Sequence, residues 1–351
     1  MNLVAQYTPS ISGEVLCPGD KSISQRAVII CSLLNEDFEI SGFLNGEDPI
    51  STANALNAIG SSIKINGASV SIKKRDIPFK DPSVNVDLGN SGTGMRLLMG
   101  LISSLGIKAT LVGDESLTKR PMLRVANPLN DMGATVTCNE GKPPVKILDG
   151  LIKDNFFYEM PIPSAQVKSS IILAALAANK KVTVIEKHPT RNHTERMISY
   201  FNGDIHTESH DLGNKITLMP SKLIPTKKYE VAGDFSSASF LIVAGLIAKE
   251  SNLLLKNVGL NPTRCGLMSV LRSMGAKIEI KNERLISNEE VGDIHVVSSE
   301  LHGIAISGDI IPNIIDEIPI LSIAASFAKG ETLITEAEDL KVISLLIVFV
   351  I

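Results

Sequence analysis

The chain has 351 residues, of which 44% are hydrophobic and 21% charged, and its formal net charge is −4. This length allows two domains with sizeable cores, and the composition is that of an ordinary globular protein. The weak negative charge, with Lys and Arg scattered along the chain, argues against nucleic acid and against an anionic membrane as partners. The N-terminus has no basic stretch followed by an apolar one, which predicts a cytoplasmic protein.

Cysteine and histidine give no sign of a metal site. The four cysteines lie far apart and form no C-x-x-C pair, which predicts reduced, mostly buried thiols. His206 and His210 have i, i+4 spacing, but Asp211 and Gly213 indicate a turn at this point instead of a metal-binding helix. The sequence therefore predicts no metal.

The first informative stretch is residues 18–26, which follow a Pro-Gly break with two cations, Lys21 and Arg26, and a hydroxyl, Ser22. The apolar run 27–34 predicts that a helix continues from here into a core. A helix start combines free N–H groups with the positive end of the helix dipole, so added cations favour an anion site. An ordinary capped helix with two solvated basic residues is the alternative that spacing alone leaves open.

A helix that runs to a glycine, followed by a short strand and hairpin, recurs along the chain. Each of these glycines fits the position just past a helix end, where a positive φ costs least. Four copies at a steady period predict a repeat architecture. The glycines are Gly60, Gly133, Gly203 and Gly275, at intervals of 73, 70 and 72 residues.

A second series of helices alternates with the first. These helices open with a polar residue and continue apolar on nearly all sides, which predicts that they are buried. The strands alternate apolar and polar residues, so each sheet is expected to expose one face to solvent and to pack its other face on the buried helices. Parallel buried helices would gather their positive ends at one surface, which would suit a polyanion. The series begins near Asp20, Ser91, Ser164, Asp234 and Asp316.

Two loops in the first half of the chain add candidate binding groups. Residues 87–96 are rich in small residues that let a ligand approach backbone N–H groups, and Asn90 and Thr93 add polar contacts. Residues 113–124 carry Arg120 among other basic residues, which favours binding of a carboxylate or phosphate. A tight strand-to-helix turn and a solvated surface loop are the respective alternatives.

Two later helix starts offer further polar groups. Ser164 and Gln166 can donate to the hydroxyls or phosphate of a ligand, although plain capping by Ser164 explains the former equally well. Asp316 and Glu317 open the last helix of the second series. A carboxylate there can cap the helix, or it can act as a base if cations share its cleft.

The end of the chain departs from the period. A further glycine is expected near residue 347, but residues 342–351 are almost continuously apolar. Ten residues are too few to span a bilayer, which needs about 20. We interpret this end as a truncation or an altered reading of the gene.

Together these motifs resemble the EPSP synthase (3-phosphoshikimate 1-carboxyvinyltransferase) family. The resemblance implies an α/β fold, a two-domain inside-out α/β bundle of repeated β-α-β-α-β-β units, here with the last unit or units missing. It implies one domain over residues 15–231 and a second, discontinuous domain from residues 1–14 and 232–351. The motifs that carry the resemblance lie at residues 18–26, 88–96, 113–121, 164–169, 190–195 and 315–319.

The resemblance also implies a reaction. The enolpyruvyl (carboxyvinyl) group of phosphoenolpyruvate would pass to the 5-hydroxyl of shikimate 3-phosphate through a tetrahedral intermediate, without metal or organic cofactor, in a monomeric transferase. Asp316 would accept the hydroxyl proton. The implied shikimate 3-phosphate ligands are Lys21, Ser22, Arg26, Ser164, Ala165, Gln166, Arg191 and Asp316. The implied phosphoenolpyruvate ligands are Lys21, Asn90, Gly92, Thr93, Arg120 and Gln166.

The family's inhibitor glyphosate occupies the phosphoenolpyruvate site, and Gly92 leaves room for it. The family continues past this point with a Lys-Glu-Ser-Asp-Arg helix, which residues 342–351 replace. That departure predicts weak substrate binding and little turnover, so an inactive remnant of the enzyme is one alternative. A lower-ranked alternative is UDP-N-acetylglucosamine 1-carboxyvinyltransferase. Against it stand the Lys-Ser pair after Asp20 and the absence of cysteine from residues 113–120.

Overall fold

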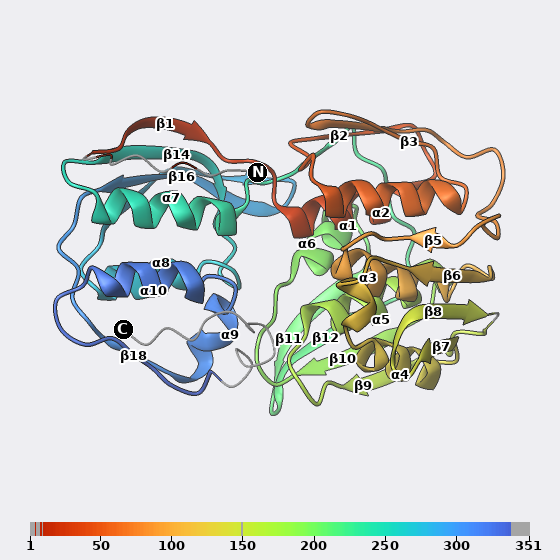
Figure 1. Cartoon of the computed structure of the whole chain (residues 1–351). Coiled ribbons are helices and arrows are strands. Elements are labelled where there is room, and N and C mark those ends of the chain that lie inside the picture. Colours follow the sequence, from red (N-terminus) through yellow and green to blue (C-terminus); the bar gives the residue numbers. More distant parts are fainter. Residues whose placement is uncertain (1–3, 5–7, 9, 149, 338–351) are drawn as a thin grey trace. The chain divides into compact units, whose positions relative to one another are not determined.

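The computed structural model describes residues 4, 8, 10–148 and 150–337. The chain divides into two compact units, of which unit 1 comprises residues 1–18 and 232–351 and unit 2 residues 19–231 (Figure 1). The boundaries expected from the sequence lie at residues 15 and 231, and as a domain assignment they stay a prediction.

Unit 2 contains three four-stranded sheets of one pattern. In each sheet an edge strand runs parallel to its neighbour, and that neighbour pairs antiparallel with one arm of a β-hairpin. The first sheet has the order β13-β2-β4-β3, from β2 (Phe38–Ser41), β3 (Ile63–Asn66), β4 (Ser69–Ile72) and β13 (Tyr229–Glu230). The second has the order β5-β6-β8-β7, from β5 (Val86–Asp87), β6 (Ala109–Val112), β7 (Thr135–Asn139) and β8 (Lys142–Leu148). The third has the order β11-β12-β10-β9, from β9 (Phe156–Glu159), β10 (Val182–Glu186), β11 (Ile205–His210) and β12 (Gly213–Leu218).

Two helices accompany each sheet of unit 2, and the first of each pair is buried almost completely. These are α1 (Lys21–Leu34), α3 (Gly92–Ile102) and α5 (Ala165–Ala178), and each follows a capping side chain: Asp20, Ser91 and Ser164 accept hydrogen bonds from Ile23, Gly94 and Val167. The second helices are α2 (Glu47–Ala58), α4 (Leu123–Asp131) and α6 (His193–Tyr200), with a short 3₁₀ turn η1 (Leu117–Lys119) before α4. Helices inside and sheets outside confirm the predicted inside-out layering for this unit (Figure 1).

Unit 1 repeats the pattern once in full. Its sheet has the order β1-β14-β16-β15, from β1 (Ser12–Leu16), β14 (Asn252–Gly259), β15 (Lys277–Ile286) and β16 (Glu289–Val297), and its helices are α7 (Phe235–Ile247) and α8 (Gly266–Ser273). A second copy begins with β17 (Ala305–Ile306), η2 (Gly308–Ile310), α9 (Ile311–Ile314) and α10 (Ile318–Ser326), and β18 (Leu333–Ile334) runs parallel to β17.

Two edge strands are exchanged between the sheets where the chain passes from one unit to the other. Strand β1 precedes α1 in the chain but pairs with β14, and β13 precedes α7 but pairs with β2. Each therefore fills the first-strand position of a repeat that lies elsewhere in the sequence. This exchange is why unit 1 is discontinuous.

The four amphipathic helices end alike, which explains the period seen in the sequence. In each one, an N–H just past the end donates to the carbonyl of the third residue from the end, which closes the turn. The residue at positive φ is Gly60, Gly133 and Gly275 in three cases. In the fourth it is Asn202 (φ 55°), so the expectation for Gly203 is wrong by one position. The closing bonds run from Ser61 to Leu56, Ala134 to Leu129, Gly203 to Ile198 and Ala276 to Leu271.

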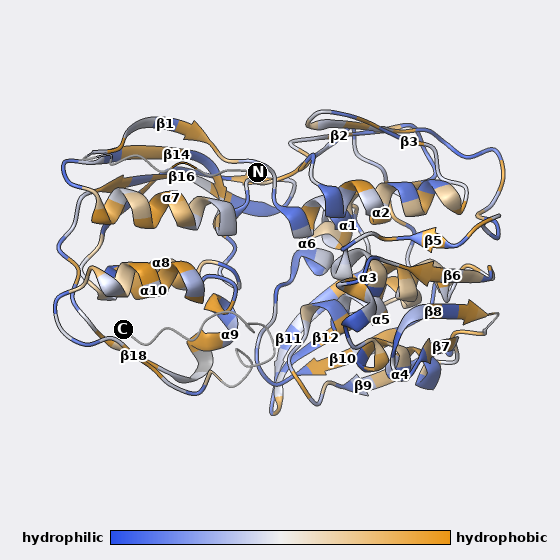
Figure 2. Ribbon diagram, viewed as in Figure 1, coloured by the Kyte–Doolittle hydropathy of each residue, from blue (hydrophilic) through white to orange (hydrophobic). Residues whose placement is uncertain are grey.

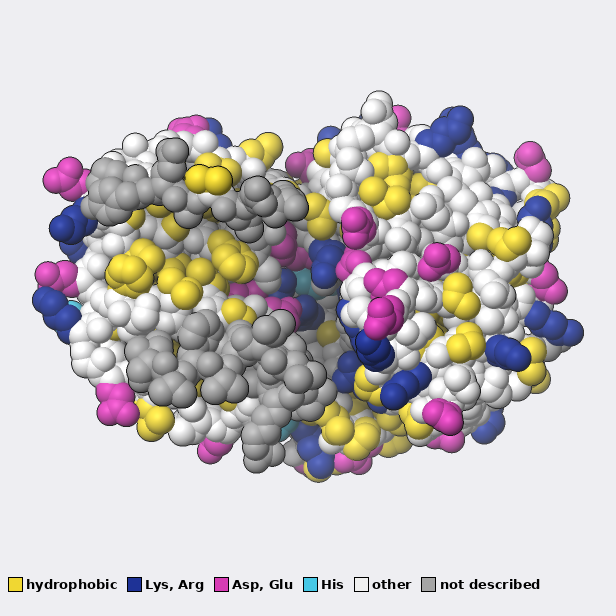
Figure 3. Space-filling model, in the orientation of Figure 1, with side chains coloured by type: hydrophobic (Ala, Val, Ile, Leu, Met, Phe, Trp, Pro, Cys, Tyr) yellow, Lys and Arg dark blue, Asp and Glu magenta, His cyan; other side chains and the backbone are white. Residues whose placement is uncertain are grey.

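The apolar helices of unit 1 are less buried than their sequence predicts. Figure 2 shows that α7 and α10 are mostly hydrophobic, like α5. Nevertheless Phe240 is 58% exposed, Phe327 61% and Ile323 39%. Figure 3 shows hydrophobic side chains on the face of unit 1 that carries these helices.

Three further expectations from the sequence can be compared with the structure. Helix α10 begins at Ile318 with Glu317 at the N-cap position, so the pair Asp316-Glu317 precedes the helix as expected. No side chain caps the helix, so the capping interpretation of this pair is wrong. His206 and His210 lie on strand β11, before the predicted turn. The interpretation of residues 342–351 falls outside the described residues.

Candidate active site

The first turns of α1, α3 and α5 are joined by buried hydrogen bonds. Gln25 of α1 donates from Nε2 to Thr52 Oγ1 of α2 at 3.0 Å and to Ser91 Oγ, the cap of α3, at 2.6 Å. Ser91 in turn accepts from the N–H of Gly94 at 3.0 Å. One amide therefore connects α1 with the middle of α2 and with the start of α3. The sequence analysis did not foresee this, because the partners of Gln25 lie 27 and 66 residues further along the chain.

Arg26 is 2% exposed and links α1 to the third repeat. Its Nε donates to Thr194 Oγ1 at 2.8 Å and its Nη2 to Ser169 Oγ at 2.9 Å. Its Nη1 donates to the carbonyl of Ser22 at 3.0 Å, within the same helical turn. The guanidinium is therefore ordered before any ligand arrives.

A second arginine, Arg96, lies one turn into α3 and was given no role from the sequence. Its Nη1 donates to Gln166 Oε1 at 2.7 Å and its Nη2 to the carbonyl of Pro121 at 3.1 Å. Gln166 donates onward from Nε2 to Thr93 Oγ1 at 2.9 Å. Burial, with the charges of Arg124 and Arg120, lowers the pKa of the Arg96 guanidinium to about 10. Clustered positive charge raises the affinity of a site for anions.

Arg120 belongs to the same cluster of cations. Its Nη2 donates to Asn90 Oδ1 at 2.5 Å and to Ser116 Oγ at 3.3 Å. Asn90 donates from Nδ2 to Asp114 at 2.7 Å. A Cβ atom added to Gly92 would lie 2.9 Å from Arg120 Nη1 and 3.4 Å from Arg96 Nη1, so both guanidinium groups lie against the start of α3.

The remaining predicted residues of unit 2 lie at the same helix starts or just before α6. Lys21 is half-exposed and its Nζ lies 3.3 Å from Asp48 Oδ2. Ser22 and Ala165 are half-buried in the first turns of α1 and α5, and Arg191 is half-buried two residues before α6. The Ser164 hydroxyl caps α5, which confirms the capping interpretation of its side chain.

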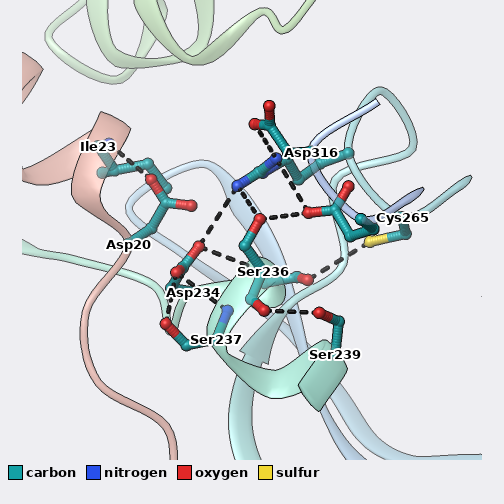
Figure 4. Close-up of polar contacts among 11 residues, drawn as sticks. Asp20, Ile23, Asp234, Ser236, Ser237, Ser239, Cys265 and Asp316 are labelled. Atoms are coloured by element: carbon teal, nitrogen blue, oxygen red, sulfur yellow. Dashed lines mark hydrogen bonds and ion pairs between the residues drawn. The ribbon is translucent and has the colours of Figure 1, made fainter. Parts of the chain in front are cut away.

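Asp316 lies in unit 1, in a cluster around Arg264 (Figure 4). Arg264 Nη1 is 3.3 Å from Asp316 Oδ2 and 3.3 Å from Glu317 Oε1, and its Nη2 is 3.5 Å from Asp234 Oδ1. Ser236 accepts from Nη2 at 2.6 Å and donates to Glu317. The Asp316 side chain is 43% exposed, whereas those of Asp234 and Glu317 are 11% and 1% exposed. Asp316 is therefore both held by a cation and accessible.

Sequence reasoning missed Arg264 entirely. It stands before α8, in a segment that carries no charge pattern of its own. The only signal in the sequence was a charge imbalance. Asp234, Asp316 and Glu317 all stand at predicted helix starts, and carboxylates that come together there need a nearby cation.

Within the described residues, no group of three or more His, Cys, Asp or Glu is arranged to hold a metal ion. In the same part of the chain, no helix has the length and hydrophobicity needed to cross a membrane. None of the four cysteines, all of which lie within the described residues, forms a disulfide bond. Burial, with the nearby charge of Asp234, raises the pKa of Cys17 to about 11.

Comparison with known proteins identifies the family. The model of the family EPSP synthase (3-phosphoshikimate 1-carboxyvinyltransferase) matches residues 6–344. The chain belongs to this family. Its resemblance to the family, inferred from the motifs, is thereby confirmed, as is the α/β fold.

Individual members of the family are similar over nearly the whole chain. The 3-phosphoshikimate 1-carboxyvinyltransferase of Thermoanaerobacter sp. (strain X514) is 45% identical over 343 residues, which cover 97% of this chain and 80% of the relative. That of Petrotoga mobilis is 46% identical over 345 residues, or 97% and 79% of the two chains. The structure of EPSP synthase from Acinetobacter baumannii superposes with a TM-score of 0.84 at 40% identity, over 94% of this chain and 75% of that one.

The comparisons do not bear out a truncated or altered C-terminus. The family match extends to residue 344, beyond the point at which the sequence analysis placed the change. The match covers 80% of the Thermoanaerobacter relative, and the expectation of weak turnover stays a prediction.

Proposed function

We propose that this chain is a transferase that moves the carboxyvinyl group of phosphoenolpyruvate to the 5-hydroxyl of shikimate 3-phosphate and releases phosphate. This is the shikimate-pathway step that leads to the aromatic amino acids, and it is the activity that the names of the relatives describe. The observation that carries the proposal is the connected polar network at three helix starts of unit 2. It contains Arg26, Arg96 and Arg120 and most of the family's motif residues.

The shikimate 3-phosphate site follows from the part of this network at α1 and α5. We assign to it Arg26 and Gln166, which are already ordered by protein contacts, and the more accessible Lys21. A phosphate favours backbone N–H groups and full positive charges at a helix start. The other residues assigned to this site are Ser22, Ser164, Ala165 and Arg191. Asp316 is assigned to it as well, as the group that contacts the 5-hydroxyl of shikimate 3-phosphate.

The phosphoenolpyruvate site follows from the start of α3. Gly92 and Thr93 present a backbone with little side-chain bulk, and Arg120 lies against it. The fork of an arginine suits a carboxylate or phosphate. Asn90, which orients Arg120, and the shared residues Lys21 and Gln166 complete the assignment.

The proposed chemistry is addition followed by elimination. The 5-hydroxyl oxygen bonds to C2 of phosphoenolpyruvate while its proton passes to Asp316, and C3 takes up a proton, which gives a tetrahedral intermediate. Loss of a proton from C3 and rupture of the C2–O bond to phosphate then restore the double bond. The arginines neutralise two polyanions and hold them together, so positioning and electrostatics lower the barrier. Arg264 Nη1 lies 3.3 Å from Asp316 Oδ2 and therefore holds the carboxylate of Asp316 in position.

The proposal also covers the oligomeric state, cofactor requirement, location and inhibition of the enzyme. We expect a monomer without a cofactor that works in the cytoplasm, and inhibition by glyphosate at the phosphoenolpyruvate site. Light scattering during gel filtration tests the monomer.

A phosphate-release assay on the purified chain tests the reaction. Phosphate should appear only when both phosphoenolpyruvate and shikimate 3-phosphate are present, and NMR should show the enolpyruvyl ether. Release that does not require shikimate 3-phosphate, or that occurs with UDP-N-acetylglucosamine as acceptor, would overturn the proposal.

A further inference from the structure

A lysine with no contact to solvent lies beside the proposed site, in the first turn of α5. Lys168 is 0% exposed. Its Nζ lies 2.9 Å from Glu186 Oε2, 2.8 Å from Glu195 Oε1 and 3.4 Å from the carbonyl oxygen of Thr190. The ammonium donates hydrogen bonds to Glu186 and to the carbonyl of Thr190, and Glu195 adds a second carboxylate at ion-pair distance.

The three partners of Lys168 come from three different segments. Glu186 is the last residue of β10, Thr190 lies in the loop 187–192, and Glu195 is in the first turn of α6. Glu186 also accepts from the hydroxyl and the N–H of Thr190, at 2.7 Å and 3.2 Å. The buried set therefore ties the loop between β10 and α6 to the start of α5.

Two proposed ligands of shikimate 3-phosphate are the direct neighbours of this set. Arg191 follows Thr190 in the tied loop. Arg26 is bonded to Ser169 and Thr194, the residues next to Lys168 and Glu195, and these two hydroxyls lie 2.7 Å apart. Movement of either end of the Lys168 set would shift the partners of Arg26 or the backbone of Arg191.

We propose that Lys168, Glu186 and Glu195 form a positioning triad that orients Arg26 and Arg191 for shikimate 3-phosphate. The proposal rests on the function proposed above. The triad makes no contact with substrate itself and acts through Thr190, Ser169 and Thr194. A buried ammonium with two carboxylates is costly in desolvation, and replacement by apolar side chains is often neutral or stabilising. Stability alone therefore gives little reason for the set, whereas fixed geometry at an anion site does.

The test is calorimetric titration of the purified full chain with shikimate 3-phosphate. Thr190→Val removes the hydroxyl that joins the loop to Glu186 and leaves all three charges in place. We expect it to weaken binding by about threefold or more, because a hydrogen bond to a charged group is lost. Lys168→Met leaves two buried carboxylates unpaired and should weaken binding by about tenfold or more. Lys215→Met, which removes an exposed ion pair with Glu208 in the same repeat, is the control and should bind like the unaltered chain.

A double mutant separates positioning from general loss of stability. If both substitutions act through the same loop, Thr190→Val added to Lys168→Met should cause little further loss of affinity. If Lys168→Met does not fold, Thr190→Val decides the question alone, with its thermal midpoint as the check on folding. Normal affinity in Thr190→Val, while Arg191→Gln binds weakly, would overturn the triad's role and leave the proposed function standing. Failure of the unaltered chain to bind shikimate 3-phosphate would overturn both.

Discussion

Arg96 and Arg120 of unit 2 and Arg264 of unit 1 have opposite kinds of partner. Arg96 and Arg120 donate to amide, carbonyl and hydroxyl oxygens, all of which are neutral. Arg264 instead lies among three carboxylates, those of Asp234, Asp316 and Glu317. Neutral partners orient a guanidinium and leave its charge available for an anionic ligand, whereas three carboxylates around one cation leave negative charge in excess.

This contrast suggests a division of labour within the proposed reaction. In that reaction, unit 2 would supply preformed positive charge for binding, and unit 1 would supply the accessible carboxylate of Asp316 as the base. Changes in the acidic cluster should then affect turnover, and changes in the cationic network should affect affinity.

The largest effect is expected from Asp316→Asn. Loss of the base should lower kcat by about 10²–10⁴-fold, the usual contribution of general base catalysis. Shikimate 3-phosphate should still bind, because most of its proposed ligands lie in unit 2. Phosphate release and calorimetric titration measure the two quantities separately.

The matched control for that change is Asp293→Asn. Asp293 is also in unit 1 and lies 3.7 Å from an arginine, Arg284, but on strand β16. Its substitution should leave kcat unchanged. Equal losses of kcat in the two variants would break the proposed division.

The next effect is expected from Arg26→Gln. A hydrogen bond to a charged group contributes about 1.5–3 kcal/mol, so affinity for shikimate 3-phosphate should fall by about 10- to 100-fold. Arg75→Gln is the control, since Arg75 donates to the carbonyl of Ser32 near the other end of α1 and its guanidinium carbon lies 3.8 Å from the centre of the Phe79 ring. Similar unfolding midpoints in urea with different affinities are the expected result. Equal affinities would contradict it.

The sequence predicted the local elements better than their surroundings. The capping residues Asp20, Ser91, Ser164 and Asp234 were predictable because a short polar side chain before an apolar run has a local cause. The exposure of Phe240 in α7 was not predictable from the sequence. An apolar helix face indicates that burial is favourable, but it does not show which element packs against that face. The strand exchange of β1 and β13 also depends on pairings more than 180 residues apart, which no local pattern records.

For the candidate site, the motif residues could be predicted from the sequence, but the contacts between them could not. Arg26 was recognised from its position at a predicted helix start, and Arg120 from its position in a basic loop. Arg96, Gln25 and Arg264 were missed, because each acts through partners from other repeats. Such partners become visible only once the chain has folded.

A moderate effect is expected from Gly92→Ala. The added Cβ would lie 2.9 Å from Arg120 Nη1, the mobile end of a side chain, so the arginine moves and the fold is preserved. An off-rotamer side chain costs about 0.5–1.5 kcal/mol, so the KM for phosphoenolpyruvate should rise by about 3- to 10-fold. Inhibition by glyphosate should weaken as well, while affinity for shikimate 3-phosphate stays the same. An unchanged KM would show that Arg120 does not contact phosphoenolpyruvate.

The smallest effect concerns the support of Arg120 and depends on pH. Hydrogen bonds from Asn90 and from the N–H of Leu117, with the charge of Arg120, hold the pKa of Asp114 below its usual value. A carboxyl whose pKa is lower in the folded than in the unfolded chain stabilises the fold above about pH 4, and this contribution disappears as the pH falls through the folded-state pKa. Asp114→Asn should therefore lower the thermal midpoint slightly at pH 7, and the difference from the unaltered chain should shrink below about pH 4.

The exposed Asp76, in the same unit, provides the control for this titration. Asp76→Asn should have the same thermal midpoint as the unaltered chain both at pH 7 and below about pH 4. If the two variants behave alike, Asp114 does not stabilise the loop, and Asn90 must be held against Arg120 by the arginine itself. Because unit 2 would then orient Arg120 through neutral groups only, that outcome would sharpen the contrast with Arg264, whose position depends on carboxylates.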